Sequence, residues 1–209
     1  MKYLLVRHPE SMQNIEKELN VLDPKVGFSD YGKKQVVRLL DAIHNEVASI
    51  ENVGVYYSPY VRTKNVVEAL KEIMPHWQYI EEPLISEIQV GDLEGYTIEE
   101  FRKNNPQEYE RFLKYKQSRC RFWYKYPAGE SPFDLNVRVN IFLNKLGVEK
   151  YDAIIIVSHL HLLKVLEMNL LGEDLEWYEN AKSMNNAEVH VIEDMKVVAK
   201  HNIVVGEDK

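Results

Sequence analysis

Short apolar runs alternate along the chain with segments of helical periodicity. The runs at 3–6, 53–57 and 153–157 are continuous and rich in β-branched or aromatic residues, which is typical of parallel strands covered on both faces. Between them, apolar residues recur every three or four positions. Two such sets are Val36, Leu40, Ile43 and Val47, and Leu135, Val139, Phe142 and Leu146. This alternation predicts an α/β fold.

Local signals indicate where several elements begin. Ser58-Pro59 and Ser131-Pro132 each place a hydroxyl cap before a proline, so a helix is expected to start at each pair. Thr97 to Glu100 has the spacing of a capping box. Near the end of the chain, 187–192 and 196–201 are predicted to form a final pair of strands.

The segment from about 97 to 128 differs from the rest of the chain. It is polar, charged and aromatic, and it is too short to form a hydrophobic core of its own. We interpret it as a helical cap inserted into a single domain that spans 1–209. Its basic and aromatic stretch, 114–126, more often forms a cap surface than a substrate-reading surface, although loops beside active sites do carry specificity.

Composition limits the possible partners. The chain has 209 residues, a formal net charge of −7 and one cysteine, Cys120. The negative balance disfavours nucleic acids and anionic membranes as partners, although a local cluster of Arg and His could still hold an anionic substrate. A lone cysteine excludes an intrachain disulfide and suits a reducing compartment. No apolar run approaches the roughly 20 residues of a bilayer-spanning helix, and the apolar start is too short for a secretory signal, so we expect a cytoplasmic protein.

Two of the predicted strands lead directly into histidines. The first ends in Arg7-His8 and the strand at 153–157 ends in Ser158-His159. Ligands of open α/β sheets bind beyond the carboxyl ends of strands, so these side chains could meet. Arg62 is expected in the first turn of a helix, where the helix N-terminus and a guanidinium both favour phosphate oxygens. Two Arg and two His together point to a phosphoryl group.

Short motifs occur in a recognisable order along nearly the whole chain. They are Arg7-His8-Pro9-Glu10-Ser11 with Asn14, Phe28-Ser29 with Gly32 and Gln35, Ser58 to Arg62, Leu84 to Glu87 with Gly91, Glu94 and Gly95, Gly129-Glu130-Ser131, Val157-Ser158-His159, and Asn185 or Asn186 with Ala187. Together these motifs resemble the phosphoglycerate-mutase-like branch of the histidine phosphatase superfamily (branch 1). The resemblance implies a three-layer α/β/α sandwich with a mostly parallel central sheet and a helical cap insertion.

The resemblance also implies a mechanism. His8 would attack phosphorus and form a phosphohistidine that water then cleaves, with one ring nitrogen held by a backbone carbonyl. Glu87 would protonate the leaving oxygen and later help deprotonate water, and a bound phosphate is expected to raise its pKa. No metal or cofactor is called for. The expected phosphate-binding residues are Arg7, Asn14, Arg62 and His159.

The sequence departs from the family pattern at two positions. Pro9 replaces the usual glycine after the nucleophile, and Leu160 follows His159 where glycine is common. Neither change removes a catalytic group, but both leave open a slow enzyme or a changed substrate range. Cys120 lacks the loop that a thiolate phosphatase needs. The remaining histidines, including His161, are interpreted as structural or surface residues.

The implied activity is that of a metal-independent, histidine acid-type phosphatase acting on a small organic phosphate ester. One alternative is a 2,3-bisphosphoglycerate-dependent phosphoglycerate mutase, which the absence of an Arg-Arg pair in the cap disfavours. Another is a phosphate-binding module without catalysis, which the intact set of His8, Arg62, Glu87 and His159 disfavours. Sugar phosphates, phosphoglycolate-like acids, nucleotides and phosphopeptides all remain possible substrates, and the oligomeric state is open.

Overall fold

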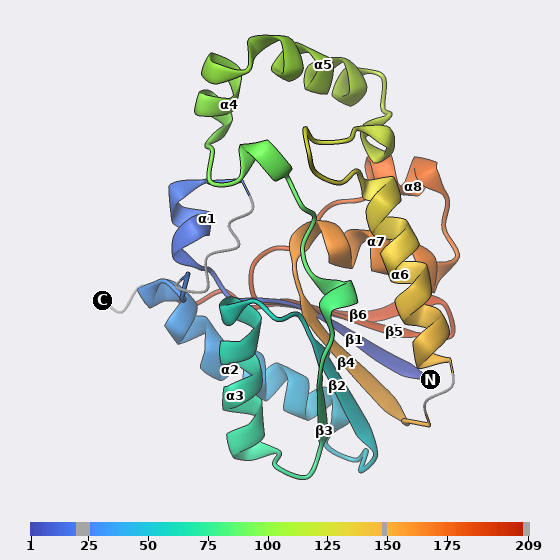
Figure 1. Cartoon of the computed structure of the whole chain (residues 1–209). Coiled ribbons are helices and arrows are strands. Elements are labelled where there is room, and N and C mark those ends of the chain that lie inside the picture. Colours follow the sequence, from blue (N-terminus) through green and yellow to red (C-terminus); the bar gives the residue numbers. More distant parts are fainter. Residues whose placement is uncertain (20–25, 148–149, 207–209) are drawn as a thin grey trace.

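A six-stranded mixed sheet forms the centre of the computed structural model, which describes residues 1–19, 26–147 and 150–206 (Figure 1). The strand order is β3-β2-β4-β1-β5-β6. The first four of these strands are parallel, whereas β5 runs antiparallel to both β1 and β6. The mostly parallel sheet of the predicted α/β fold is therefore confirmed. The strands are β1 (Lys2–Arg7), β2 (Val53–Tyr57), β3 (Gln78–Glu81), β4 (Ala153–Ser158), β5 (Glu188–Glu193) and β6 (Lys196–Asn202).

Helices cover both faces of the sheet, which gives three layers. β4 is buried along its whole length, and its side chains alternate between two apolar clusters. Those at odd positions pack with α2 (Asp30–Val47) and α3 (Val61–Ile73), and those at even positions with α6 (Pro132–Leu146) and α7 (Leu160–Leu171). The continuous apolarity of this strand thus has the predicted cause, because both of its faces are covered.

The predicted polar and aromatic segment at 97–128 is largely helical. It contains α4 (Ile98–Asn104), α5 (Pro106–Gln117) and the 3-10 turn η3 (Arg121–Trp123), which stand apart from the sheet at the top of Figure 1. The capping box predicted at Thr97 begins α4. The remaining short elements are α1 (Met12–Glu16), η1 (Pro83–Ile85), η2 (Gly91–Leu93) and α8 (Leu175–Asn180).

Of the two predicted Ser-Pro helix starts, one is confirmed and one is wrong. Ser131 caps α6 and accepts a hydrogen bond from the Asp134 N–H. α3 instead begins at Val61, with Tyr60 as its N-cap. Ser58 does not cap because it still belongs to the sheet edge: its N–H donates to the Val157 carbonyl at the end of β4. The predicted final strand pair is confirmed as β5 and β6.

Candidate active site

His8 follows the last residue of β1 and is almost fully buried, with 3 % of its surface exposed. Its backbone N–H donates to the Ser158 carbonyl at 3.2 Å, so the ends of β1 and β4 are tied together. The ring Nδ1 lies 2.7 Å from the Pro9 carbonyl oxygen, which can only accept a hydrogen bond. Nδ1 therefore carries the ring hydrogen and Nε2 keeps its lone pair, as a nucleophile requires.

The surroundings of His8 keep its ring neutral. Burial lowers the pKa of the imidazole, and the positive charges of Arg62 and Arg7 lower it further. The hydrogen bond to Pro9 opposes these effects without outweighing them. The result is a pKa well below the ordinary value for histidine, so the unprotonated nitrogen is available at neutral pH.

The loop after the nucleophile is held by the N-terminal turns of α2. The Glu10 N–H donates to Gln35 Oε1 at 2.9 Å, and the Glu10 carboxylate accepts from the Ser29 hydroxyl at 2.7 Å. Gly32 allows the close approach, since a Cβ at this position would lie 2.0 Å from the Glu10 carbonyl oxygen. These contacts give the Ser29, Gly32 and Gln35 motif a physical task, which is to fix the backbone that orients His8.

A cavity of about 130 Å³ opens beside His8. Five of the six residues predicted for the site line this cavity, and they come from four different segments of the chain. The sixth, His159, is fully buried behind the cavity wall, with its ring centroid 5.3 Å from that of His8. The structure thus brings the whole predicted set together. The five lining residues are Arg7, His8, Asn14, Arg62 and Glu87.

His159 positions Arg62. Its Nδ1 accepts a hydrogen bond from Arg62 Nε at 3.2 Å, and its Nε2 lies 2.8 Å from the Ser58 hydroxyl. Burial and the charge of Arg62 lower the pKa of His159 far below its usual value, so the ring is a neutral acceptor for Arg62. Because both ring nitrogens are engaged in this structure, direct contact between His159 and a phosphate stays a prediction.

The two arginines remain cationic in this buried place. Burial lowers the pKa of Arg62 to about 10, although the charge of Glu87 opposes the change, and the Tyr60 ring lies 4.7 Å from its guanidinium carbon. Arg7 donates from Nη1 to the Met184 carbonyl at 2.6 Å. Among the described residues, its buried Nε has no hydrogen-bond partner. An unsatisfied buried donor on a side chain that lines the cavity suits an anionic ligand.

Asn14 is oriented by its neighbours. Its Oδ1 accepts hydrogen bonds from the backbone N–H and the hydroxyl of Ser11, at 3.0 and 2.9 Å, and from Asn186 Nδ2 at 3.0 Å. Three donors converge on the carbonyl oxygen, so the amide NH2 is the group that Asn14 can offer to the cavity. A neutral donor at this place agrees with the role predicted for it.

Glu87 lies at the N-terminus of α7. Its carboxylate accepts hydrogen bonds from the backbone N–H groups of Ile88, His161 and Leu162 at 3.0, 3.2 and 3.1 Å, and the last two belong to the first turn of the helix. Burial raises the pKa of Glu87, but the contact with His161 and the backbone donors outweigh it and lower the pKa below its usual range. In this arrangement the ionised carboxylate of Glu87 is the favoured form.

With this geometry in place, comparison with known proteins is informative. A sequence model of the histidine phosphatase superfamily (branch 1) matches residues 3–197. The chain belongs to this superfamily. A curated relative, phosphoserine phosphatase 1 of Hydrogenobacter thermophilus, is 28 % identical over 97 % of this chain and 92 % of its own length.

Two further relatives extend the comparison. Fructose-2,6-bisphosphatase of Saccharomyces cerevisiae is 26 % identical over 84 % of this chain, and the match spans 36 % of the yeast protein. The crystal structure of the α-ribazole phosphatase from Shigella flexneri superposes with a TM-score of 0.80, covers 100 % of both chains and is 19 % identical in sequence. At that identity the likeness supports the fold alone, and it is the phosphoglycerate-mutase-like fold that the motifs implied.

His161 lies in the site, contrary to our interpretation of it as a structural or surface residue. It lines the same cavity as His8, and its Nδ1 is 3.5 Å from Glu87 Oε2. The reason is its place in the first turn of α7, where the backbone also binds Glu87. The sequence did contain a signal: His161 stands two residues after His159, at the start of the same helix.

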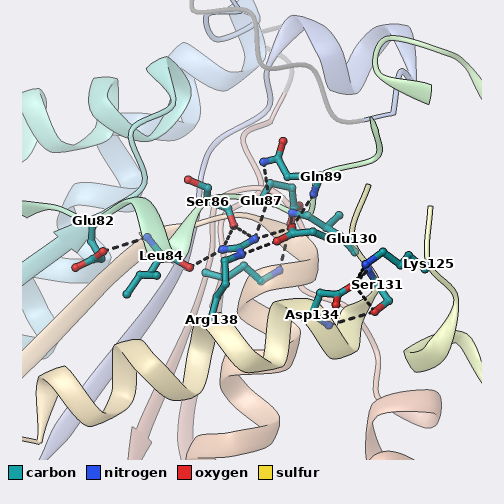
Figure 2. A network of polar contacts seen from close by, with 12 residues as sticks. Glu82, Leu84, Ser86, Glu87, Gln89, Lys125, Glu130, Ser131, Asp134 and Arg138 are labelled. Carbon is teal, nitrogen blue, oxygen red and sulfur yellow. Dashed lines mark hydrogen bonds and ion pairs between the residues drawn. The ribbon is translucent and has the colours of Figure 1, made fainter. Parts of the chain in front are cut away.

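Arg138 is a second residue of the candidate site that sequence reasoning missed. Figure 2 shows its guanidinium between the Glu130 carboxylate and the backbone before Glu87. It donates from Nε and Nη2 to both Glu130 oxygens at 2.8 and 2.9 Å, and to the Ser86 carbonyl at 3.2 Å. Glu130 in turn accepts from the Gln89 N–H at 2.9 Å. The Gly129-Glu130-Ser131 motif stands out in the sequence, but only the fold shows that Glu130 and Arg138 together hold the loop that carries Glu87.

Residues 1–19, 26–147 and 150–206 contain no group of three or more His, Cys, Asp or Glu arranged to hold a metal ion. Within the same ranges, no helix is long and apolar enough to cross a bilayer.

Proposed function

We propose that this protein is a metal-independent phosphomonoester hydrolase that works through a phosphohistidine at position 8. One observation carries the proposal: the ring of His8 is buried, neutral and fixed by Pro9 in the cavity that Arg7, Arg62 and Glu87 also line. That combination supplies a nucleophile, fixed cations for the phosphoryl oxygens and a carboxyl group for proton transfer. Relatives named as phosphatases support the same reading.

In the first step, Nε2 of His8 attacks phosphorus while the bond to the ester oxygen breaks. Arg7 and Arg62 hold the equatorial oxygens, and Asn14 adds a neutral donor. Glu87 gives its proton to the leaving oxygen. In the second step, water attacks the phosphohistidine, Glu87 takes a proton from that water, and inorganic phosphate leaves with His8 neutral again.

Glu87 must gain a proton before it can act as the acid. In the structure its pKa is lowered by His161 and by backbone N–H donors. A phosphate with two negative charges in the same cavity repels the ionised carboxylate and so raises the pKa of Glu87. Substrate binding would thus favour the protonated form of Glu87, which can act as the acid. Once Glu87 has given its proton to the leaving group, its ionised carboxylate can act as the base.

The experiment that tests the proposal is turnover of p-nitrophenyl phosphate in the presence of EDTA, with His8→Ala as the control. We expect wild-type turnover to persist in EDTA and His8→Ala to fall to background. Rapid quenching with 32P-labelled ester should leave an acid-labile, base-stable label on the wild type only. Turnover that survives in His8→Ala, or that EDTA abolishes, would contradict the proposal.

The mutase alternative has its own measurement. Incubation of 3-phosphoglycerate with a trace of 2,3-bisphosphoglycerate should release inorganic phosphate without accumulating 2-phosphoglycerate. The cap segment supports this expectation, since it contains no Arg-Arg pair to retain a bisphosphorylated intermediate. Rapid isomerisation without released phosphate would favour the mutase instead.

A further inference from the structure

A second cavity of about 190 Å³ adjoins the cavity of His8. Ile88, Tyr126 and His161 line both cavities, so the two share a wall. A substrate whose phosphate lies beside His8 would therefore extend into this second space. Its volume suits a short group and not a large one, because sites for drug-sized ligands measure about 300–1,000 Å³.

The lining of the second cavity is aromatic and positively charged. Lys116, Arg121 and Lys164 all contribute to it, together with the rings of Phe112, Tyr124 and Tyr178, and the described lining residues include no Asp or Glu. The pKa of Tyr126 is raised to about 12 by burial and by the charge of Glu87. Its hydroxyl thus stays neutral and able to donate.

Lys164 is the distinctive member of this lining. It is on α7 and 8 % exposed, and its ammonium donates to the Ala181 carbonyl at 2.7 Å and lies 4.8 Å from the centre of the Tyr178 ring. No carboxylate of the described residues lies within ion-pairing distance of it. Burial and the charge of Arg121 lower its pKa, and the more distant charges of Glu179 and Glu167 oppose this change without outweighing it. A buried cation without a carboxylate is costly, and an anionic ligand would offset that cost.

The other two cations of the cavity are differently placed. Arg121 is paired with Glu179, Nε to Oε2 at 2.8 Å, and also donates to the Glu179 carbonyl. Lys116 is exposed on α5, where solvent screens its charge. Among the residues that the structure describes, Lys164 is thus the one buried cation of this cavity that forms no direct ion pair. One unit of charge matches a carboxylate better than a phosphate, which carries nearly two negative charges at neutral pH.

From this charge balance we infer that the substrate is a phosphate monoester of a short carboxylic acid, whose carboxylate binds Lys164 in the second cavity. The inference rests on the proposed function and deepens it, since it names the class of ester that the site selects. The ester oxygen would lie near Glu87 and His161, between the two cavities. A single carbon chain of a few atoms then connects phosphate and carboxylate.

Matched substrates test this inference. Phosphoserine and phosphoethanolamine differ only by the carboxylate. In the second pair, 3-phosphoglycerate has a carboxylate where glycerol 3-phosphate has a hydroxymethyl group. We expect kcat/KM of the wild type to favour the carboxylate of each pair by about tenfold or more, the range of a charge-assisted hydrogen bond. Fructose 1,6-bisphosphate and fructose 6-phosphate differ by a second phosphate. For this pair we expect no comparable difference in kcat/KM, because the second cavity should not favour a second phosphate.

The variant Lys164→Met keeps the length and the apolar stem of the side chain but removes the charge. The carboxylate preference, taken as the ratio of kcat/KM within each pair, should fall about tenfold. Because it is a ratio, a general loss of activity cancels. Lys200→Met, on the exposed face of β6, is the control and should keep the wild-type ratio, and Lys164→Arg should restore part of it.

The outcomes separate this inference from the proposed function. Hydrolysis of all esters without preference for a carboxylate, or an unchanged ratio in Lys164→Met, would overturn the inference and leave the phosphatase assignment intact. A preference for the bisphosphate as large as that for the carboxylates would overturn the choice of a carboxylate. Absence of turnover with every ester would defeat both.

Discussion

Both proton transfers of the proposed reaction depend on the carboxyl group of Glu87. In Glu87→Gln the backbone donors of Ile88 and Leu162 keep an acceptor, so the side chain should stay in place without a proton to give. We expect alkyl phosphates, whose leaving oxygens need protonation, to lose about 100-fold or more in kcat. p-Nitrophenyl phosphate should lose much less, because its leaving group departs without help.

The measurement for Glu87→Gln is the dependence of kcat on leaving-group pKa, compared between wild type and variant over a series of esters. A steeper dependence in the variant supports proton donation by Glu87. Equal losses for all esters would assign Glu87 to substrate binding instead.

Gly32 shows at the residue scale how tightly the nucleophile loop is packed. A Cβ at this position would meet the Glu10 carbonyl oxygen at 2.0 Å, which is backbone and cannot rotate away. Gly32→Ala should therefore lower the free energy of unfolding by about 1–3 kcal/mol, as overpacking does, and should also reduce kcat by displacing the loop that orients His8. Urea denaturation and a p-nitrophenyl phosphate assay measure the two effects.

A matched control for Gly32→Ala exists in the same protein. Gly147 at the end of α6 has ordinary helical dihedral angles and would place a new Cβ no closer than 3.5 Å to another atom. Gly147→Ala should change the free energy of unfolding by no more than about 0.5 kcal/mol. Similar destabilisation in both variants would show that the close approach at Glu10 is not what Gly32 provides.

At the scale of elements, α6 reaches the acid through Arg138. Its guanidinium joins Glu130 to the Ser86 carbonyl, one residue before Glu87. Removing this support in Arg138→Met should loosen the segment and reduce proton transfer more than phosphate binding. We expect kcat for alkyl phosphates to fall about tenfold or more, with a steeper leaving-group dependence.

A double-mutant cycle distinguishes this positioning role from general destabilisation. If Arg138 acts through Glu87, Arg138→Met should cost little activity when added to Glu87→Gln. The change in free energy of unfolding is measured alongside. Fully additive losses in kcat would mean that Arg138 supports the fold and not the acid.

At the scale of the whole molecule, the buried histidines link stability to pH. The pKa values of His8 and His159 are lowered in the folded protein, so below about pH 6.5 the unfolded chain binds protons that the folded chain does not. The free energy of unfolding should thus decrease as pH falls below that value, by up to about 1.4 kcal/mol per pH unit for each ring. Stability from these two groups is fully present above it.

Denaturation curves at several pH values between 7.5 and 5 measure this dependence. Replacing His159 by Gln should reduce the slope by about one proton, because glutamine does not titrate. A slope as steep in His159→Gln as in the wild type would mean that other groups cause the loss.

Much of the architecture could be predicted from the sequence, because the signals are local or repeat with a period. The continuous apolar run of β4 follows from helices on both faces, and the capping box at Thr97 needs only four residues. The start of α3 could not be predicted in this way. Ser58 has the composition of a cap, but its backbone completes the sheet edge and its hydroxyl lies against His159, a residue 101 positions away.

The candidate site was only partly predictable for a similar reason. Arg7, His8, Arg62 and Glu87 stand in short motifs whose order along the chain was recognisable. His161 and Arg138 act through contacts with Glu87 and its backbone, across 74 and 52 positions of chain. Distances of that kind are set by packing, so these contacts could not be predicted, although the place of His161 two residues after His159 was a local signal for that residue.

A single helix unites the chemistry with the choice of substrate. α7 presents its first-turn N–H groups to Glu87, starts from the histidine that steadies Arg62, and holds Lys164 about one turn further along. Because these groups belong to one helix, a tilt of α7 would change proton transfer by Glu87, phosphate binding by Arg62 and carboxylate binding by Lys164 at the same time. Evolving a new preference for this protein should therefore proceed more easily through the opposite wall, formed by α5 and η3, than through α7 itself.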